Sequence, residues 1–541
     1  MAPNPLIDSH TDGIERIIPH TQEMNLPGGR RVVLKFGGTS VGKFPLNIAD
    51  IVQAALTQSS IAVVCSARST STKNEGTTNR LLHAAREAEN KSSNRHYVQI
   101  VDLIRYDHMK AGKDVIKSLD IADQYAAAVN AECDSLLKIL DSAQHLEGVS
   151  SGGIISLIED SIVSEGEKLS CQFMTALLQD RGVEAQYIDL STVVPITESQ
   201  ALDDQFYNSV SRTIAQKVHE CGDKVPVITG FFGVVPGGLL STIGRGYTDL
   251  CAGLAAVGLK AEELQVWKEV DGIFTADPRR VPTARLLPSI TPPEAAELTF
   301  YGAEVIHNLT MEQVIQARIP IRIKNVMNPR NSGTIISMED TDEWNPDAPL
   351  DGPRLFRTHS KSSTVVTQSR RPKRPTAVTV KRHIVILNVR SNLRLRRHPF
   401  LMAVLSVLNE WNIGVAICSN SEIHLTVAFE CQLPVIASTG SNAADELRTR
   451  DPNFYGALVD LRQYGTVNWA PNRAILSLIG QELNYMTGIS GKFFSTLGDN
   501  DINIEMISQG GSERNISCVI HERDADRALS VVHTSLFTFL E

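Results

Sequence analysis

Short apolar runs and amphipathic stretches alternate through residues 31–336. The stretches at 79–89 and 166–182 have the spacing of apolar positions that favours helices, and the second ends at a glycine. The apolar runs predict buried strands at 31–34, 61–67, 185–190, 225–233 and 264–270. Strands and helices that take turns in this way predict an α/β fold, with helices layered on both faces of a mainly parallel sheet.

Three stretches depart from this alternation. Residues 93–147 are polar with a helical pattern, so we expect a helical excursion from the sheet. Residues 337–375 are rich in Asp, Pro, Ser and Arg, which is typical of a linker, and the basic run RRPKRP at 370–375 belongs to it. Residues 1–30 contain acidic groups and no apolar core for a secretory signal, so we expect a mobile tail.

Beyond the linker the pattern of strands and helices occurs twice. Residues 376–460 read as strand, helix, strand and strand, and residues 461–541 repeat that order before a last helix. Two such β-α-β-β-α-type units in tandem predict a pair of ferredoxin-like domains. A simple dimerisation scaffold is the alternative interpretation of this repeat.

Composition excludes several classes of protein. A chain of 541 residues is too long for one core and predicts roughly three or four domains. The net charge of −9 disfavours a surface for nucleic acid or anionic membranes, and no run approaches the ~18 apolar residues of a membrane span. The 8 cysteines form no Cys-x-x-Cys pair, which predicts reduced, buried thiols. We therefore expect a cytoplasmic protein without nucleic-acid or membrane partners.

The stretch VVLKFGGTSVGKF at 32–44 is a near match to the nucleotide-binding P-loop. That loop needs a hydroxyl residue after its lysine as a Mg²⁺ ligand, but Phe44 stands there and offers no oxygen. A second interpretation places Lys35 at the carboxyl end of a strand, where ligands bind in open α/β sheets. Gly37 and Gly38 then present backbone N–H groups to a phosphate. A plain strand-to-helix turn explains this stretch equally well.

The stretch STIGRGYTDLCAGLAAVGL at 241–259 combines an arginine between two glycines with the start of an alanine-rich helix. Arg245 offers a bidentate fork to a carboxylate, and the N–H groups at the helix start attract anions. Asp249 fits either a functional carboxylate or an ordinary helix N-cap. Taken alone, this motif favours the N-cap.

Polar groups also follow other predicted strands. Arg279 suits a phosphate, Phe274 either stacks on a base or packs, and Trp267 is expected in the core. Glu167 starts a predicted helix, where the dipole favours a carboxylate, although an ordinary exposed glutamate fits too. The end of the strand at 61–67 is dense with hydroxyl groups.

Together these motifs resemble the aspartate kinases of the amino-acid kinase superfamily, and the fungal form most closely. The resemblance covers about residues 31–541 and rests on six motifs in the family's order: KFGGTSVG, CSARS…EGTTNRLL, SEGEKLS, GRGYTDL, WKEVDGIFTADPR and FYGAEVIH…QARIPIRIKN. It implies an amino-acid kinase domain at 31–336 and ACT units at 376–460 and 461–541. It also implies transfer of the γ-phosphoryl group of ATP to the β-carboxylate of L-aspartate, with Mg²⁺ bound to the ATP.

The resemblance implies a role for each matching residue. Lys35 matches the family's catalytic lysine, and Asp249 matches the aspartate that helps to organise lysine and metal. Arg245 and Glu167 would hold the α-carboxylate and the α-ammonium group of aspartate. Further aspartate contacts are implied for Ser66, Thr78, Gly246 and Thr248. The nucleotide side is implied to contain Gly37, Gly38, Lys268, Glu269, Phe274, Arg279 and Lys324. No metal site made only of protein ligands is visible.

The first ACT unit departs from the family, which holds an amino-acid effector at the interface of that unit. Pro399 stands where the family usually has glycine, and Ala416 stands where it usually has aspartate. Proline removes a backbone N–H for an effector carboxylate, and alanine removes a partner for its ammonium group. Ser419, Asn420 and Ser421 remain as candidate effector contacts. We expect weak or no inhibition by threonine, and a homo-oligomer formed through the ACT units.

Two other functions are alternatives to an active, ACT-regulated aspartate kinase. A catalytically silent amino-acid sensor is disfavoured because Lys35, Glu167, Arg245 and Asp249 are all present. A kinase for glutamate or acetylglutamate is disfavoured by GRGYTD and by the tandem ACT units. The family feeds threonine and methionine synthesis in fungi, and a copy dedicated to a secondary metabolite would look alike in its kinase domain.

Overall fold

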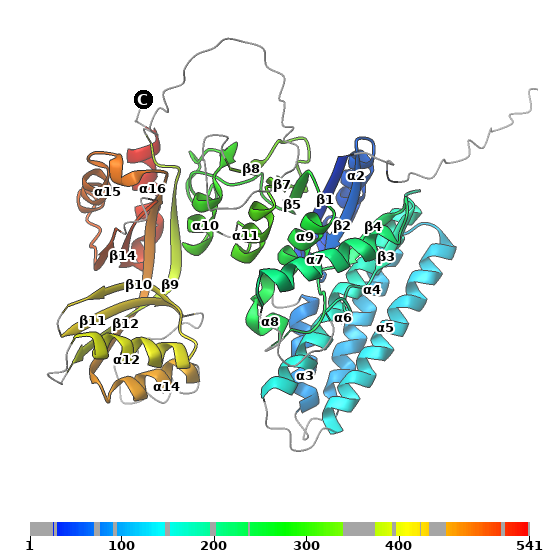
Figure 1. Cartoon of the computed structure of the whole chain (residues 1–541), viewed down its shortest axis with the longest axis horizontal. Coiled ribbons are helices and arrows are strands. Elements are labelled where there is room, and N and C mark those ends of the chain that lie inside the picture. The colour runs from blue at the N-terminus through cyan, green and yellow to red at the C-terminus, as the bar shows by residue number, and fades with distance from the viewer. Residues whose placement is uncertain are drawn as a thin grey trace, which may run out of the picture.

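The computed structural model describes an N-terminal domain and a C-terminal region. The described residues are 25, 30–69, 76–89, 95–145, 152–194, 202–235, 238–303, 305–338, 374–391, 397–421, 423–431, 451–509 and 514–538. The tail predicted at 1–30 and the linker predicted at 337–375 therefore lie almost entirely outside them. In Figure 1 the N-terminal domain runs from blue to green and the C-terminal region from yellow to red.

An eight-stranded sheet in the order β3-β4-β2-β1-β5-β7-β8-β6 forms the centre of the N-terminal domain. Its strands are β1 (Arg30–Phe36), β2 (Ser59–Cys65), β3 (Ala185–Ile188), β4 (Val225–Thr229), β5 (Glu263–Lys268), β6 (Ser289–Ile290), β7 (Ile321–Asn325) and β8 (Thr334–Ile336). Every neighbouring pair is parallel except β7 and β8. The mainly parallel sheet predicted from the apolar runs is confirmed.

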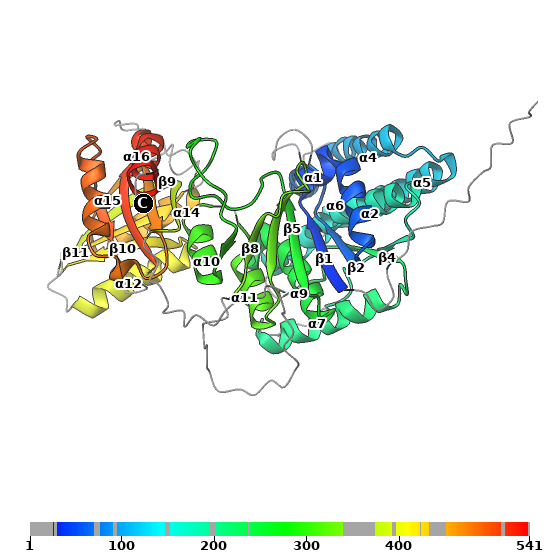
Figure 2. The ribbon, with the colours of Figure 1, turned by 90° about the horizontal axis from the view of Figure 1, so that it is seen from above.

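Helices cover both faces of this sheet, so the domain has three layers (Figure 2). One buried cluster contains residues of α1 (Gly38–Lys43), α2 (Pro45–Leu56), α3 (Thr77–Glu89), α4 (His96–Val115), α5 (Leu119–His145) and α6 (Gly152–Asp180). The other contains residues of α7 (Asp204–His219), α8 (Leu239–Thr242), α9 (Tyr247–Gly258), α10 (Pro292–Phe300) and α11 (Asn308–Gln316). The short 3₁₀ helix η2 (Gly244–Gly246) joins α8 to α9.

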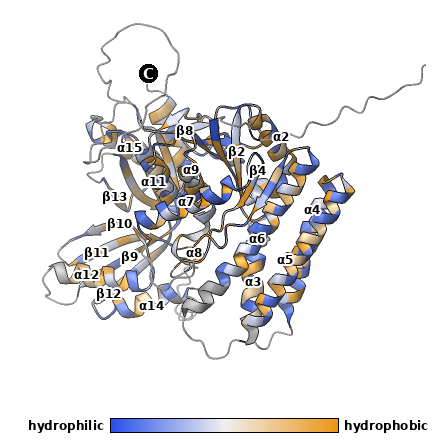
Figure 3. Ribbon diagram, turned by 45° about the vertical axis from the view of Figure 1, so that its right-hand side comes forward, coloured by the Kyte–Doolittle hydropathy of each residue, from blue (hydrophilic) through white to orange (hydrophobic). Residues whose placement is uncertain are grey.

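The helical excursion predicted at 93–147 is confirmed for its described residues, 95–145. Helices α4 and α5 pack on each other and on α3 and α6, away from the rest of the sheet (Figure 1). Apolar and polar positions alternate along these helices, which is visible as orange and blue bands in Figure 3. Amphipathic helices of this kind bury one face in a bundle.

The C-terminal region is built on a six-stranded antiparallel sheet in the order β10-β11-β9-β12-β14-β13. Its elements are β9 (Ala377–Ser391), α12 (Arg397–Glu410), β10 (Val415–Asn420), β11 (His424–Glu430), α14 (Pro452–Leu461), β12 (Gly465–Ile479), η3 (Leu483–Tyr485), α15 (Ile489–Gly498), β13 (Met506–Ser508), β14 (Asn515–His521), η4 (Glu522–Asp524), α16 (Ala525–His533) and η5 (Thr534–Thr538). This is the order of strands and helices that the repeat predicted.

The long strands β9 and β12 each serve both halves of the region. The end of β9, 384–390, pairs with β11, and its beginning, 377–381, pairs with the second half of β12. We call α12, β10, β11 and α14, with the adjoining halves of β9 and β12, unit 1. Unit 2 consists of α15, β13, β14 and α16 with the other halves. The two units are therefore joined by continuous strands.

Unit 2 packs on the segment at 270–287, which follows β5 of the N-terminal domain. The Thr275 hydroxyl lies 2.8 Å from His533 Nε2 of α16, and the backbone N–H of Val378 donates to the Thr275 carbonyl at 2.8 Å. The Arg285 guanidinium donates to the Phe537 carbonyl at 2.9 Å. Burial lowers the pKa of His533, which favours a neutral ring at this contact. The segment thus connects a central strand of the N-terminal domain to unit 2.

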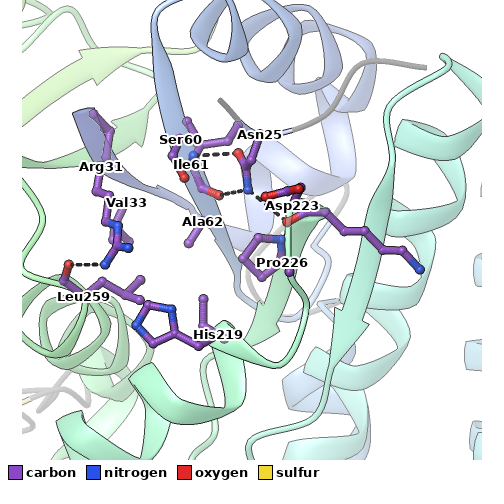
Figure 4. Close-up of a pocket in the computed structure, with 14 residues that line it drawn as sticks. Asn25, Arg31, Val33, Ser60, Ile61, Ala62, His219, Asp223, Pro226 and Leu259 are labelled. Atoms are coloured by element: carbon purple, nitrogen blue, oxygen red, sulfur yellow. Dashed lines mark hydrogen bonds between the residues drawn. The ribbon is translucent and has the colours of Figure 1, made fainter. Parts of the chain in front are cut away.

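A small cavity of about 140 Å³ lies at the amino ends of β1, β2 and β4 (Figure 4). Arg31 and His219 line it, and Asn25 closes one side. The Asn25 side chain is buried, donates to the carbonyls of Ile61 and Lys224, and accepts from the Ile61 N–H. Asn25 therefore links the chain before β1 to the amino ends of β2 and β4, at the end of the strands opposite the predicted site.

Candidate active site

Lys35 lies near the carboxyl end of the central strand β1, in register with Val64 of β2 and Val266 of β5. Its ammonium group is 2.6 Å from Asp249 Oδ1, and the two side chains are only 11% and 15% exposed. Asp249 lies in the first turn of α9, and the N-cap of that helix is Gly246. The alternative that Asp249 is merely an N-cap is therefore wrong.

The charge of Asp249 is set by the cations around it. Burial alone would raise the pKa of its carboxyl group, but Lys35 and Lys268 hold the pKa below its ordinary value. His307 at the start of α11 adds to this effect. Asp249 is therefore ionised at neutral pH and can hold Lys35 in place.

Glu167 lies in the middle of α6, since that helix begins fifteen residues earlier than Glu167, at Gly152. Its side chain is 1% exposed, so both the exposed-glutamate interpretation and the helix-start argument are wrong. Its Oε1 accepts a hydrogen bond of 2.6 Å from the Thr248 hydroxyl. Burial raises the pKa of Glu167 to about 7, and hydrogen bonds from Thr248 and Tyr247 offset part of that shift. A buried carboxyl with such a pKa in a site is suited to meet a cation.

The turn from β1 to α1 brings the backbone close to the end of β2. A Cβ atom added to Gly38 would lie 2.0 Å from the Ala67 carbonyl oxygen, so only glycine fits there. A Cβ atom on Gly37 would meet nothing within 4 Å, which leaves the backbone open to a ligand. Ser40 lies two residues after Gly38, and its hydroxyl donates to Glu269 Oε1 at 2.7 Å, which fixes that carboxylate beside the turn.

The hydroxyl residues expected to contact aspartate lie at the end of β2 and the start of α3. The backbone N–H of Ser66 donates to the Phe36 carbonyl at 3.1 Å, which places Ser66 beside the end of β1. Thr78 is the second residue of α3 and is half-buried. Its neighbour Thr77 is buried against His108 of α4. The backbone N–H of Thr77 donates to the Arg68 carbonyl at 3.1 Å, so the start of α3 lies beside the segment that follows β2. The contacts of Ser66 and Thr78 with aspartate remain predictions.

Cationic and aromatic side chains gather at the ends of β5 and β7. Trp267 is buried, as expected, and its ring stacks on Phe36 at 6.0 Å between centroids. The Lys324 ammonium lies 4.9 Å from the centre of the Trp267 ring. Burial lowers the pKa of Lys324. Lys268, the last residue of β5, is close enough to Asp249 to lower the pKa of its carboxyl.

Two residues predicted on the nucleotide side lie in the segment at 270–287. Phe274 is half-buried and forms an isolated bridge with Leu286. The Arg279 side chain is 82% exposed and pairs with Asp277 at 3.1 Å. These two residues are placed beside unit 2, and their contact with a nucleotide remains a prediction.

Arg245 and Gly246 lie in η2, directly before α9. The structure describes the backbone of Arg245, and its side chain lies outside the described atoms. A Cβ atom on Gly246 would lie 2.4 Å from the His307 ring, so glycine is required for this close approach.

Three residues near the site were not singled out from the sequence. Ser40 and His307 fall inside the family motifs, so the motifs could have pointed to them. Asp160 of α6 carries no such signal, because its partners are backbone N–H groups eighty residues away.

The candidate effector residues lie on the edge strand of unit 1. Ser419 and Asn420 end β10, Ser421 follows it, and all three are exposed. Ala416 lies on the same strand and is half-buried. Pro399 lies in the first turn of α12, and its side chain is outside the described atoms. Proline is tolerated there, as expected.

Three wider features complete the comparison with the sequence. Seven of the eight cysteines are buried, and Cys418 is the exposed exception. Among the described residues, no group of three or more His, Cys, Asp or Glu side chains could hold a metal ion. No helix in the described ranges is long and apolar enough to cross a membrane.

Comparison with known proteins identifies the families of both regions. A model of the amino acid kinase family matches residues 30–325, and an ACT domain model matches residues 476–536. The aspartokinase of Schizosaccharomyces pombe is 46% identical over 514 residues, covering 95% of this chain and 94% of that protein. The aspartokinase of Saccharomyces cerevisiae is 44% identical over 517 residues, covering 94% of this chain and 93% of that protein.

Solved structures agree on the fold. Aspartokinase III of E. coli in complex with aspartate and ADP superimposes with a TM-score of 0.68 at 24% identity, covering 94% of this chain and 99% of that chain. An aspartate kinase of Gibberella fujikuroi is 45% identical over 526 residues, covering 94% of this chain and 98% of that protein. The match to family models and to full-length relatives shows that this chain belongs to the amino acid kinase family and, within it, to the aspartokinases.

Proposed function

We propose that this aspartokinase transfers the γ-phosphoryl group of ATP to the β-carboxylate of L-aspartate and forms 4-phospho-L-aspartate. The observation that carries this proposal is the buried cluster of Lys35, Asp249 and Glu167 at the carboxyl ends of the central strands. The cluster combines a fixed cation with a carboxyl group suited to an ammonium ion. The E. coli relative, whose structure contains aspartate and ADP, supports the same pair of ligands.

Phosphoryl transfer needs reactants held in line and negative charge neutralised. Lys35 is oriented by Asp249 at 2.6 Å, so its ammonium group is in place before the phosphoryl group arrives. Gly37 leaves its backbone open on the same side, where an N–H group can meet a phosphate oxygen. These residues would stabilise the charge on the transferred group.

The substrate is recognised by opposite charges. Glu167 would accept the α-ammonium group of aspartate, which would compensate the cost of burying its carboxylate. Arg245 would bind the α-carboxylate in a bidentate pair, with Ser66, Thr78, Gly246 and Thr248 around the substrate. Both α-groups of the amino acid are then held, and the β-carboxylate points toward the nucleotide.

The nucleotide would lie along the ends of β5 and β7. Lys268 and Lys324 supply positive charge there, and Glu269 is fixed by Ser40. A Mg²⁺ ion bound to the phosphates of ATP would enter with the nucleotide and neutralise part of its charge. Phe274 and Arg279 would complete the nucleotide side.

The decisive experiment measures ADP release by the purified protein with L-aspartate and with L-glutamate. We expect turnover with aspartate only, and no turnover with either substrate would favour the silent-sensor alternative. Arg245→Ala should raise the KM for aspartate far more than the KM for ATP, because a carboxylate clamp is lost. Equal increases in both KM values would move Arg245 to the nucleotide side.

We further infer that the product enters threonine and methionine synthesis through homoserine, in the cytoplasm, and that the ACT units mediate oligomerisation. Pro399 and Ala416 suggest a copy released from feedback, as would suit a dedicated secondary-metabolite pathway. Kinetics with and without threonine, together with the mass of the assembly in solution, test these inferences.

A further inference from the structure

Helix α6 contributes a second buried carboxylate, Asp160, which the proposed reaction does not use. Asp160 is 1% exposed, and its carboxylate accepts the backbone N–H groups of Leu239 and, at 3.1 Å, of Leu240. These are the first two residues of α8, whose own N-cap is Gly238 and provides no capping side chain. Asp160 therefore caps α8 from another helix.

Asp160 and Glu167 are seven residues apart on α6, about two helical turns or roughly 10 Å, and so face the same side. Glu167 holds Thr248 at the start of α9, while Asp160 holds the start of α8. Between these two anchors lie α8 and η2, separated only by Ile243. The segment at 239–248 is thus fixed to α6 at both ends, and Arg245 lies within it.

We propose that Asp160 is a positioning residue that sets the affinity for aspartate by fixing the segment that carries Arg245. This inference rests on the proposed function, in which Arg245 binds the α-carboxylate of the substrate. A carboxylate is suited to this task because its two oxygens each accept one of the adjacent N–H groups. The proposed nucleotide side lies at the turn from β1 to α1 and at and after the ends of β5 and β7, outside the segment at 239–248, so Asp160 should act on one substrate only.

The isosteric variant Asp160→Asn tests the proposal in the full-length protein. In this variant the NH₂ group of the introduced asparagine would face one of the two backbone N–H groups of α8, so one of the hydrogen bonds that Asp160 accepts is lost. The loss of a hydrogen bond to a charged group predicts a KM for aspartate about 10- to 100-fold higher. The KM for ATP should stay within about twofold. Glu159→Gln is the matched control, since it removes the same charge one residue away and should leave both KM values unchanged.

Asp160→Ala gives a graded second variant, because it removes both acceptor oxygens whereas Asn keeps one. Its KM for aspartate should be at least as high as that of Asp160→Asn. Equal increases in both KM values, or an unchanged KM for aspartate in folded Asp160→Asn protein, would overturn the proposal. Circular dichroism confirms the fold of each variant before the kinetics are compared.

The Arg245→Ala background separates this inference from the proposed function. If Arg245→Ala leaves the KM for aspartate unchanged, the proposed role of Arg245 fails and the inference fails with it. If that variant raises the KM, adding Asp160→Asn should cause little further increase, because both changes remove the same contact. A full additional 10- to 100-fold increase in the double variant would show that Asp160 acts elsewhere, and would overturn the positioning role alone.

Discussion

Two regions of this chain are proposed to bind an amino acid, and they are built in opposite ways. The proposed aspartate site buries its charges, with Glu167 enclosed and Lys35 held by Asp249. The candidate effector residues Ser419 to Ser421 are exposed at the end of the edge strand β10 and carry no charge. Fixed, buried groups bind more tightly because fewer side chains must be ordered when the ligand arrives. We therefore expect specific binding in the first region and weak binding in the second.

The two regions are nevertheless joined by continuous structure. Strands β9 and β12 run from unit 1 into unit 2, and unit 2 packs on the segment at 270–287. That segment follows Lys268 and Glu269 of the candidate site. An effector on unit 1 could therefore act on the proposed nucleotide side through unit 2.

The largest effect should come from Lys35, the buried cation of the proposed aspartate site. Lys35→Ala should lower kcat by about 10²–10³, because one electrostatic contact to the transferred group is lost, while circular dichroism stays unchanged. Lys43→Ala is the control, since this lysine directly follows the same motif but is exposed, and the turnover of this variant should match the wild type. Near-normal turnover in Lys35→Ala would remove Lys35 from the catalytic group.

Two substitutions in unit 1 should restore inhibition by threonine. Wild-type activity should be insensitive to sub-millimolar threonine, and Pro399→Gly with Ala416→Asp should lower the inhibitory threonine concentration by about 10- to 100-fold, through a restored N–H group and carboxylate. Ile423→Asp, which adds the same charge on the exposed hairpin beside β10, serves as the control. Strong inhibition of the wild type would show that other residues of unit 1 compensate.

The buried carboxyl of Glu167 should make aspartate binding depend on pH. Its pKa of about 7 means that the ionised form is lost as the pH falls below 7, so kcat/KM for aspartate should drop about tenfold per pH unit there. The pH profile of kcat/KM measures this, and Glu167→Gln should abolish the dependence. A wild-type profile that is flat between pH 5 and 8 would contradict the role of Glu167.

The same pKa has a consequence for stability. Burial raises the pKa of Glu167 in the folded protein above its ordinary value of 4.5, so the folded protein holds the proton on Glu167 more tightly than the unfolded chain does. This contribution to the free energy of unfolding is complete below pH 4.5 and is lost as the pH rises through about 7. Aspartate supplies an ammonium partner, so its stabilising effect in thermal melts should be larger at pH 8 than at pH 6.

The smallest effects are expected from substitution of Arg279 or Arg280 in the segment at 270–287, and the two substitutions should affect different properties. Arg280 pairs with Asp526 of unit 2 at 3.1 Å, and both side chains are about half exposed. Arg280→Ala should therefore change the free energy of unfolding by only about 0–1 kcal/mol, measured in urea, and leave the KM for ATP unchanged. Arg279→Ala should instead raise the KM for ATP, and an unchanged value would remove Arg279 from the nucleotide side.

The sequence by itself determined the fold class and the family of this protein. Apolar runs and amphipathic periods are local properties, so the strands of the parallel sheet and the paired C-terminal units could be predicted from them. The sequence also placed Gly37 and Gly38 at the end of a strand, but only the structure shows that a side chain on Gly38 would meet the Ala67 carbonyl. The motifs identified the candidate residues, and every motif except SEGEKLS, which lies inside α6, ends a strand or starts a helix.

Only the tertiary structure decided which charges are buried and what they meet. The sequence fits Asp249 as an N-cap, because its actual partner, Lys35, is more than two hundred residues away along the chain. Glu167 appeared as a possible surface residue at a helix start, but α6 begins at Gly152 and packing encloses it. Asp160 gave no signal because its partners are backbone groups of a distant segment. A pKa depends on solvent exclusion and on charges brought together by folding, which local sequence patterns do not encode.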